Sequence, residues 1–199
     1  MIHRRGGEPA REKTSIVTKY FPGKRVMSPA KLQQGNSFGY LPAVKTEKTD
    51  ILYFAGCMTH LTPSIKNAMV TILNASGLNW KFMDENGGAC CGRPLMLAGQ
   101  DKEARELINF NSQIIWKSGA QILVTSCPIC YKVFKESYYL DVEVMHHSQF
   151  IKNIIDDGTV RMNFLQKRIT YHTPCELGRN SGVYDEPKDL LRYLAVLEK

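Results

Sequence analysis

The sequence predicts an α/β fold built on a doubly wound, mostly parallel β-sheet. Short, continuous apolar runs, as expected for strands buried on both faces, alternate with segments whose apolar residues recur at helical spacing. Glycine and proline residues separate these segments. Because strands that alternate with helices form parallel sheets covered on both sides, we expect this fold class from Asp50 onward. With 199 residues and 43% apolar content, the chain is long enough to bury a core.

The first strand and the first helix have clear boundaries. The apolar run at 51–55 is the first expected strand. Thr62 and Pro63 then open a helix as its N-cap and first residue, because proline lacks an N–H that would be unpaired there anyway. Gly77 ends this helix, since glycine readily adopts the left-handed conformation that closes helices.

The same alternation continues to residue 157. A glycine-rich loop between Asn86 and Gly92 follows the second strand, and Ser126 is expected to cap a helix that begins within the segment 127–130. Further strands are expected at 80–83, 121–125 and 142–145, and further helices at 101–118 and 148–157.

This pattern divides the chain into three regions. Residues 1–49 show no sustained periodicity and contain many glycine and proline residues, so we expect an irregular arm or linker there. Residues 50–158 form the first domain. Residues 159–199 begin a second, incomplete unit, with a strand near 168–171 and a helix near 186–194.

The positive charge of the chain is concentrated in its N-terminal region. Residues 1–49 carry ten Lys or Arg against three Asp or Glu, whereas the rest of the chain carries sixteen of each. A solvated arm is the plain interpretation of such a charge run, and docking on an acidic partner or a membrane surface is the alternative. No combination of aromatic and basic residues typical of a nucleic-acid interface accompanies the charge, so we expect no nucleic-acid partner.

The cysteines and the absence of targeting signals indicate a reducing compartment. No apolar run reaches about 18 residues, so we expect no membrane span, although peripheral membrane association stays open. The N-terminus lacks the apolar stretch of a secretory signal. Six cysteines in such a chain are more typical of metal ligands or redox groups than of disulfides. We therefore expect a cytoplasmic protein.

Five of the six cysteines follow the first three expected strands. Cys57 comes directly after the first strand, Cys90 and Cys91 after the second, and Cys127 and Cys130 after the third. The carboxyl ends of parallel strands meet at one edge of the sheet, where ligands bind in α/β proteins. We therefore expect three segments that are distant in sequence to bring five thiols together.

Five soft sulfur ligands at one point suit an iron–sulfur cluster better than any other common site. An ordinary cubane cluster and a structural zinc ion each take four cysteines, so one thiol is surplus in both. Gly92, beside the cysteine pair, lets backbone N–H groups approach the sulfurs. Two alternatives stay open: a structural zinc module that holds a complex together, and a redox dithiol formed by the C-x-x-C pair alone. The sequence singles out no catalytic residue.

At these positions the chain resembles the cysteine-rich CCG domain family, which includes the B and D subunits of heterodisulfide reductase. Other members are iron–sulfur subunits of glycolate oxidase, lactate utilisation systems and anaerobic glycerol-3-phosphate dehydrogenase. The resemblance covers residues 50–195. The motifs that match the family's first repeat in type, order and spacing are Gly56-Cys57, Cys90-Cys91-Gly92 and Cys127-Pro128-Ile129-Cys130.

The resemblance implies a Rossmann-like half-domain. It also implies that the chain is an electron-transfer subunit of an oxidoreductase complex. That complex would be heterodisulfide reductase-like or associated with 2-hydroxyacid or glycerol-3-phosphate dehydrogenases. It implies partners of the flavoprotein or ferredoxin type. In some relatives zinc takes such a site. The residues that the resemblance assigns to one noncubane [4Fe-4S] cluster are Cys57, Cys90, Cys91, Cys127 and Cys130.

Residues 171–179 resemble the opening of the family's second repeat, with Cys175 as its first cysteine. Thr173 and Glu176 depart from the Asp and His that the family usually has there, and no second cysteine pair follows. The chain is therefore expected to be either a fragment of a longer protein or a one-cluster protein, which favours electron transfer over independent disulfide reduction. Three roles stay open, those of Cys175, His146 and His172.

Overall fold

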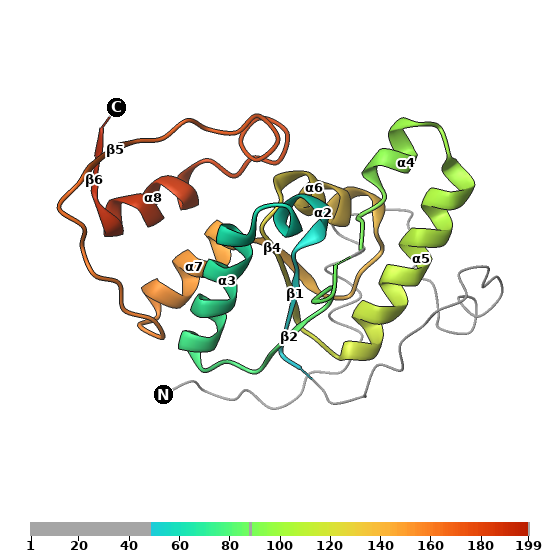
Figure 1. Cartoon of the computed structure of the whole chain (residues 1–199), viewed down its shortest axis with the longest axis horizontal. Coiled ribbons are helices and arrows are strands. Elements are labelled where there is room, and N and C mark those ends of the chain that lie inside the picture. The colour runs from blue at the N-terminus through green and yellow to red at the C-terminus, as the bar shows by residue number, and fades with distance from the viewer. Residues whose placement is uncertain (1–48, 88, 199) are drawn as a thin grey trace.

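A four-stranded parallel sheet lies at the centre of the structure (Figure 1). The computed structural model describes residues 49–87 and 89–198, so the expected arm at residues 1–49 lies outside the described residues except for Thr49. The strands, in the spatial order β2-β1-β3-β4, are β1 (Ile51–Phe54), β2 (Trp80–Phe82), β3 (Ile122–Thr125) and β4 (Glu143–His146).

Helices cover both faces of this sheet, which confirms the predicted doubly wound α/β fold. In Figure 1, α3 and α7 lie on one side of the strands and α5 on the other. The short helices α2 and α4 follow β1 and β2, at the upper edge of the sheet in that view. The helices of this domain are α2 (Gly56–His60), α3 (Pro63–Ser76), α4 (Arg93–Leu97), α5 (Asp101–Ser118), α6 (Pro128–Ser137) and α7 (His147–Asp156).

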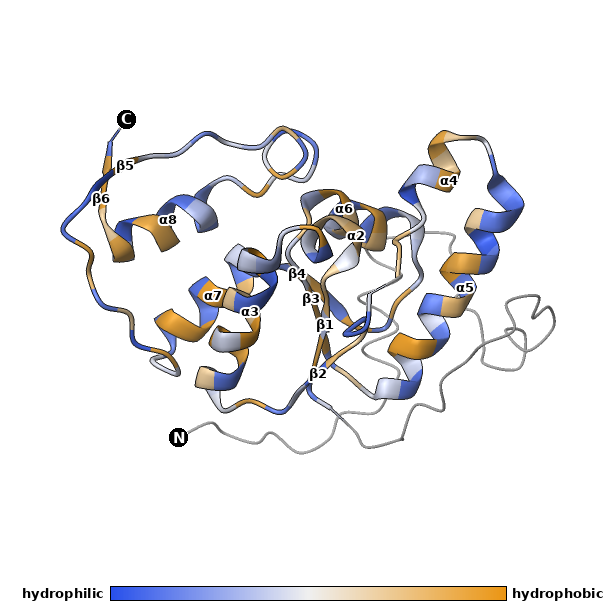
Figure 2. Cartoon of the chain, in the orientation of Figure 1, coloured by the Kyte–Doolittle hydropathy of each residue, from blue (hydrophilic) through white to orange (hydrophobic). Residues whose placement is uncertain are grey.

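The side chains of β1 pack alternately into two cores, because successive strand residues point to opposite faces of a sheet. Ile51 and Tyr53 join the core that α3 and α7 cover. Leu52 and Phe54 join the core that α5 and α6 cover. All four side chains are buried, and Figure 2 shows the apolar character of the strands between the two helical layers. The uninterrupted apolar run therefore marks the central strand of a sheet covered on both sides.

Most helix boundaries agree with the expected signals, and one does not. Thr62 is the N-cap of α3, Pro63 is its first residue, and Gly77 closes it with φ +66°. The prediction for α6 was wrong by one residue, because Cys127 rather than Ser126 is the N-cap. The sequence did not predict α2 or α4, because helices of five residues are too short for a periodic apolar pattern.

A second, smaller unit follows the first domain. Strand β5 (Arg168–Thr170) pairs in parallel with β6 (Val196–Glu198), which the sequence did not predict, and α8 (Asp185–Leu194) connects them. Helix α8 lies against α7, where Gln149 donates to Glu186 over 3.1 Å. None of the helices in the described part of the chain has the length and apolar character needed to cross a membrane.

Candidate functional site

Three cysteine-bearing segments meet at the carboxyl edge of the sheet. The chain places β2 on one side of β1 and β3 on the other, so strand order reverses at β1. Ligands of open α/β sheets bind in the crevice at such a reversal, beyond the carboxyl ends of the strands. Cys57 lies in α2, directly after β1, and Cys127 caps α6, directly after β3.

Pairwise interactions link the thiols of the five cysteines, as the pKa shifts of four of them reflect. The pKa of Cys130 is raised first by hydrogen-bond interaction with the Cys127 thiol and then by that with the Cys91 thiol. The thiols of Cys57 and Cys90 form a second pair, and Cys90 interacts electrostatically with Cys91. Cys57 is exposed and Cys90 half-buried, whereas the other three are buried. Among the five, Cys57 is the one nearest to solvent.

The local hydrogen bonds favour thiolate at two of the buried cysteines. The pKa of Cys127 is lowered, first by the Cys130 thiol and then by the backbone N–H groups of Cys130 and Ile129, at the start of α6. The pKa of Cys91 is lowered by the same Cys130 thiol. Conversely, these contacts raise the pKa of Cys130, and burial raises the pKa of Cys90. A lowered pKa increases the fraction of thiolate, the form that binds metals, at Cys91 and Cys127.

Two glycines are needed for the backbone to pass this close to the sulfurs. Gly56 has φ +73°, and a Cβ there would lie 3.0 Å from Cys130 Sγ. Gly92 has φ +94° and caps α4, and its N–H donates to Cys90 Sγ over 3.4 Å. Both positions combine the left-handed backbone that favours glycine with a sulfur contact.

A buried polar pair holds the backbone of the Cys90–Cys91 segment. Asn111, from α5, donates to the carbonyl of Cys90 over 2.9 Å and to the hydroxyl of Tyr138 over 2.8 Å. That hydroxyl donates to the carbonyl of Cys91 over 3.0 Å. Asn111 is 1% exposed and Tyr138 5% exposed, so these bonds are shielded from water. The cysteine pair is thus attached to two helical segments of the scaffold.

Tyr138→Phe is expected to destabilise the metal-free chain by about 1–2 kcal/mol. The change removes one hydrogen-bond partner from the carbonyl of Cys91 and one from the side-chain amide of Asn111, which are both buried. Urea denaturation followed by circular dichroism measures the loss. Tyr184→Phe removes the same atom from an exposed residue and serves as the control. Equal free energies of unfolding for the two variants would contradict the assigned role of the Tyr138 hydroxyl.

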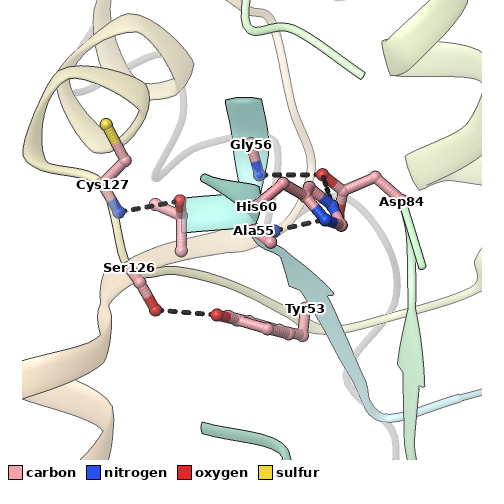
Figure 3. Close-up of polar contacts among 8 residues, drawn as sticks. Tyr53, Ala55, Gly56, His60, Asp84, Ser126 and Cys127 are labelled. Atoms are coloured by element: carbon pink, nitrogen blue, oxygen red, sulfur yellow. Dashed lines mark hydrogen bonds and ion pairs between the residues drawn. The ribbon is translucent and has the colours of Figure 1, made fainter. Parts of the chain in front are cut away.

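A second buried polar pair joins α2 to the loop after β2. The carboxylate of Asp84 accepts hydrogen bonds from the backbone N–H groups of Ala55 and Gly56, over 2.9 and 2.8 Å. The imidazole Nε2 of His60 lies 3.3 Å from the same carboxylate (Figure 3). Figure 3 also shows Ser126 and Cys127, at the start of α6, beside this part of β1, where the hydroxyls of Tyr53 and Ser126 lie 2.8 Å apart.

The sequence patterns did not reveal these supporting residues. Asp84, Asn111 and Tyr138 carry no motif, and His60 stood out from the sequence by nothing but its residue type. One available signal was the polar Asn111 on the apolar side of its helix, one turn from Ile108 and Ile115.

His146 is buried at the end of β4, where it caps α7 rather than contacting the cysteines. Its Nδ1 accepts from the backbone N–H of Ser148 over 3.3 Å, and the side chain of Gln149 accepts from the backbone N–H of His146. Burial lowers the pKa of His146 to about 3, and the neighbouring His147 adds to this effect. Among the described residues, the Nε2 atom of His146 has no hydrogen-bond partner.

The free energy of unfolding is expected to fall on acidification because of His146. Its pKa is about 3 in the folded chain against an ordinary value of 6.5, so the unfolded chain binds the proton first. This contribution is complete above pH 6.5 and is lost as the pH falls towards 3, by about 2 kcal/mol between pH 7 and 5. Urea denaturation at both pH values measures it. His146→Asn, which keeps a capping side chain, should show a smaller loss, and an unchanged loss would contradict this assignment.

The remaining cysteine stands apart from this set. Cys175 is exposed in the loop after β5, and none of the thiol contacts described above involves it. Its role and that of His172 stay open.

The donor set suits an iron–sulfur cluster in chemistry, because five soft thiols lie together and backbone N–H groups point at their sulfurs. Within residues 49–87 and 89–198, no group of three or more His, Cys, Asp or Glu side chains is already arranged as a metal-ion site. Metal binding therefore requires these side chains to rearrange.

Comparison with known proteins identifies relatives over most of the chain. It is 33% identical over 165 residues to the D subunit of dihydromethanophenazine:CoB–CoM heterodisulfide reductase from Methanosarcina barkeri, a match that covers 77% of this chain and 40% of the relative. It is 30% identical over 150 residues to the B subunit of fumarate reductase (CoM/CoB) from Methanothermobacter marburgensis, covering 73% of this chain and 29% of the relative.

A third relative is the EtfAB:quinone oxidoreductase of Syntrophomonas wolfei, 27% identical over 150 residues that cover 72% of this chain and 21% of the relative. The chain thus spans less than half the length of each of these proteins. No solved structure matches significantly. The family model described as "Cysteine-rich domain" (CCG) matches residues 51–135, which contain all five clustered cysteines. This chain therefore belongs to the cysteine-rich CCG domain family.

Proposed function

We propose that this chain is an iron–sulfur electron-transfer component of an oxidoreductase complex. The observation that carries the proposal is the meeting of five thiols, from three segments, at the carboxyl edge of the sheet. The names of the relatives support it, since they are heterodisulfide reductase, fumarate reductase and quinone oxidoreductase proteins. The residues proposed to hold one [4Fe-4S] cluster are Cys57, Cys90, Cys91, Cys127 and Cys130.

A noncubane arrangement is proposed because it employs every thiol. A cubane cluster takes four cysteines, whereas five are linked by pairwise interactions here. Such a cluster, when bound, accepts and donates single electrons. The chain's own part is to supply thiolates and to direct backbone N–H groups at sulfur, as Gly92 does towards Cys90. Donors of this kind raise the reduction potential of a cluster because they stabilise added negative charge.

The partners are proposed to be flavoprotein or ferredoxin-type subunits of the same complex. Cys57 is exposed and Cys90 half-exposed, so the thiol set reaches the surface on one side, where a redox partner can approach. The free cysteines fit the reducing conditions of a cytoplasm. A heterodisulfide reductase-like reaction is a narrower version of the proposal and requires a second site beyond these five residues.

A second candidate function rests on the C-x-x-C segment. The thiols of Cys127 and Cys130 are hydrogen-bonded, and the lowered pKa of Cys127 is typical of a redox dithiol. In this case the two thiols would form a reversible disulfide in metal-free protein, and the other three cysteines would be dispensable.

Anaerobic production of the full chain, followed by iron, sulfide and zinc analysis, tests the first proposal. The expected result is about four iron and four sulfide per chain, with a paramagnetic signal that changes on reduction or oxidation. Stoichiometric zinc without iron would favour a structural module instead. Folded protein that contains neither metal, with a reversible Cys127–Cys130 disulfide by mass spectrometry, would favour the dithiol.

A further inference from the structure

Asp84 is a buried carboxylate at the junction of two cysteine-bearing segments. It lies in the loop after β2, which continues to Cys90 and Cys91, and its side chain is fully buried. Its hydrogen-bond partners belong to the other segment, which contains Cys57. A buried carboxylate is costly unless it is well supplied with donors, so its position requires an explanation.

Two backbone N–H donors and the imidazole of His60, all from the α2 region, surround this carboxylate (Figure 3). Oδ1 accepts from the backbone N–H of Ala55 over 2.9 Å, and Oδ2 accepts from that of Gly56 over 2.8 Å. His60 Nε2 lies 3.3 Å from Oδ2. This contact is a short nitrogen–oxygen distance rather than a hydrogen bond, because Nε2 has no hydrogen-bond partner among the described residues. Asp84 thus holds both ends of α2, from its first backbone amides to its last side chain.

This arrangement fixes the distance between the three cysteine-bearing segments. Cys57 lies within α2, between the two points at which Asp84 holds it. Gly56, whose N–H donates to Asp84, also passes so close to Cys130 Sγ that a Cβ would lie at 3.0 Å. A shift of Asp84 would therefore move Cys57 relative to both Cys90 and Cys130.

The carboxylate also brings negative charge to the backbone directly before Cys57, since it accepts from Ala55 and Gly56. Burial raises the pKa of Asp84, while the two backbone N–H groups and His60 oppose this effect by stabilising the ionised form. Because charges interact strongly in a buried environment, an ionised Asp84 disfavours the addition of an electron nearby. A negative charge at this point therefore lowers the reduction potential of a redox group held by the cysteines.

We propose that Asp84, held by His60, is a positioning residue of the five-cysteine site and that its charge lowers the reduction potential of the iron–sulfur cluster bound there. The inference rests on the proposed function, because it needs a redox-active group at the site. It goes beyond that function by assigning roles to two residues that are not cysteines.

The decisive comparison is between Asp84→Asn and Glu85→Gln in the full, iron-loaded chain. Asparagine keeps the shape and one acceptor oxygen but removes the charge. Glu85 is adjacent and exposed, so the glutamine variant makes the same change of charge in solvent. Redox titration followed by electron paramagnetic resonance is expected to show that Asp84→Asn favours reduction about tenfold, or ~59 mV for one electron. Glu85→Gln should match the natural chain. Equal potentials in the two variants, at equal iron content, would overturn the electrostatic role.

A second measurement tests the positioning role without iron. In the metal-free chain, amide hydrogen exchange at Ala55 and Gly56 is expected to be about tenfold faster in His60→Ala than in the natural sequence, because the Asp84 carboxylate, which accepts from both amides, loses the imidazole that lies 3.3 Å from it. Unchanged exchange rates at these two amides would overturn the proposal that Asp84 and His60 hold α2 in place.

A failure of the inference can be told apart from a failure of the proposed function. If the natural chain binds no iron, the proposed function fails, and with it the electrostatic half of the inference. The exchange measurement then still decides whether Asp84 and His60 hold α2. If Asp84→Asn folds but takes up no iron, Asp84→Glu must restore uptake, and its failure to do so would overturn the requirement for a carboxylate.

Discussion

Cys91→Ser is expected to reduce the iron content of anaerobically loaded protein from about four per chain to background. Cys91 is buried, its thiol is hydrogen-bonded to Cys130, and it interacts electrostatically with both Cys90 and Cys127. It therefore lies at the centre of the thiol set. A serine hydroxyl is a hard donor that stays protonated at neutral pH, so it replaces a thiolate poorly as a ligand to iron. Iron and sulfide assays after reconstitution measure the loss.

The matched control for this variant is Cys175→Ser. It makes the same atomic change at an exposed cysteine outside the thiol contacts, and it should keep the iron content of the natural chain. A Cys91→Ser protein that binds as much iron as the control would remove Cys91 from the ligand set. A dithiol protein would also behave differently, because Cys91→Ser would leave its Cys127–Cys130 disulfide almost unaffected.

Phe54→Ala is expected to lower the free energy of unfolding by about 3–5 kcal/mol. Phe54 is fully buried at the end of β1 and packs edge-to-face on Phe134 of α6, with ring centroids 5.0 Å apart. Its removal leaves a cavity next to Gly56, at the base of the cysteine site. Since a typical domain has a total stability of about 5–15 kcal/mol, this loss would be a large part of the whole.

Urea denaturation followed by circular dichroism measures the effect of Phe54→Ala. Trp116→Ala is the control, because Trp116 is 60% exposed on α5 and its truncation should change stability by about 0.5 kcal/mol or less. Similar losses in the two variants would show that Phe54 is not a central element of the core. The Phe54 variant is also expected to bind iron less tightly, since β1 carries the segment that contains Cys57.

The order of strands and helices was readable from local patterns because each has a periodic or chemical signature. Buried parallel strands are continuous apolar runs, as at Ile51–Phe54, and Pro63 and Gly77 occupy the helix positions that their backbones favour. The error at α6 has a tertiary cause, a contact between residues 73 positions apart. Ser126 is the better capping residue by type, but its hydroxyl lies 2.8 Å from that of Tyr53, and Cys127 takes the cap position.

The supporting residues of the site depend on contacts between distant parts of the chain. Asp84 and Gly56 are 28 positions apart, and Tyr138 and Cys91 are 47 apart. Hydrogen bonds of this kind leave no repeat or motif in the sequence, so only packing of the strands and helices reveals them. The same is true of His60, which gains its importance from a carboxylate that the fold places beside it.

The sequence by itself determined the fold class and the number and spacing of the cysteines proposed as ligands, because apolar periodicity and cysteine spacing are local properties. The tertiary structure decided how the cysteines are held: Asn111 and Tyr138 hold the Cys90–Cys91 backbone, and Asp84 holds α2. The physical reason is burial. A polar side chain acquires a defined partner and a strong interaction only when the folded chain excludes water around it, and that exclusion is a property of the whole domain.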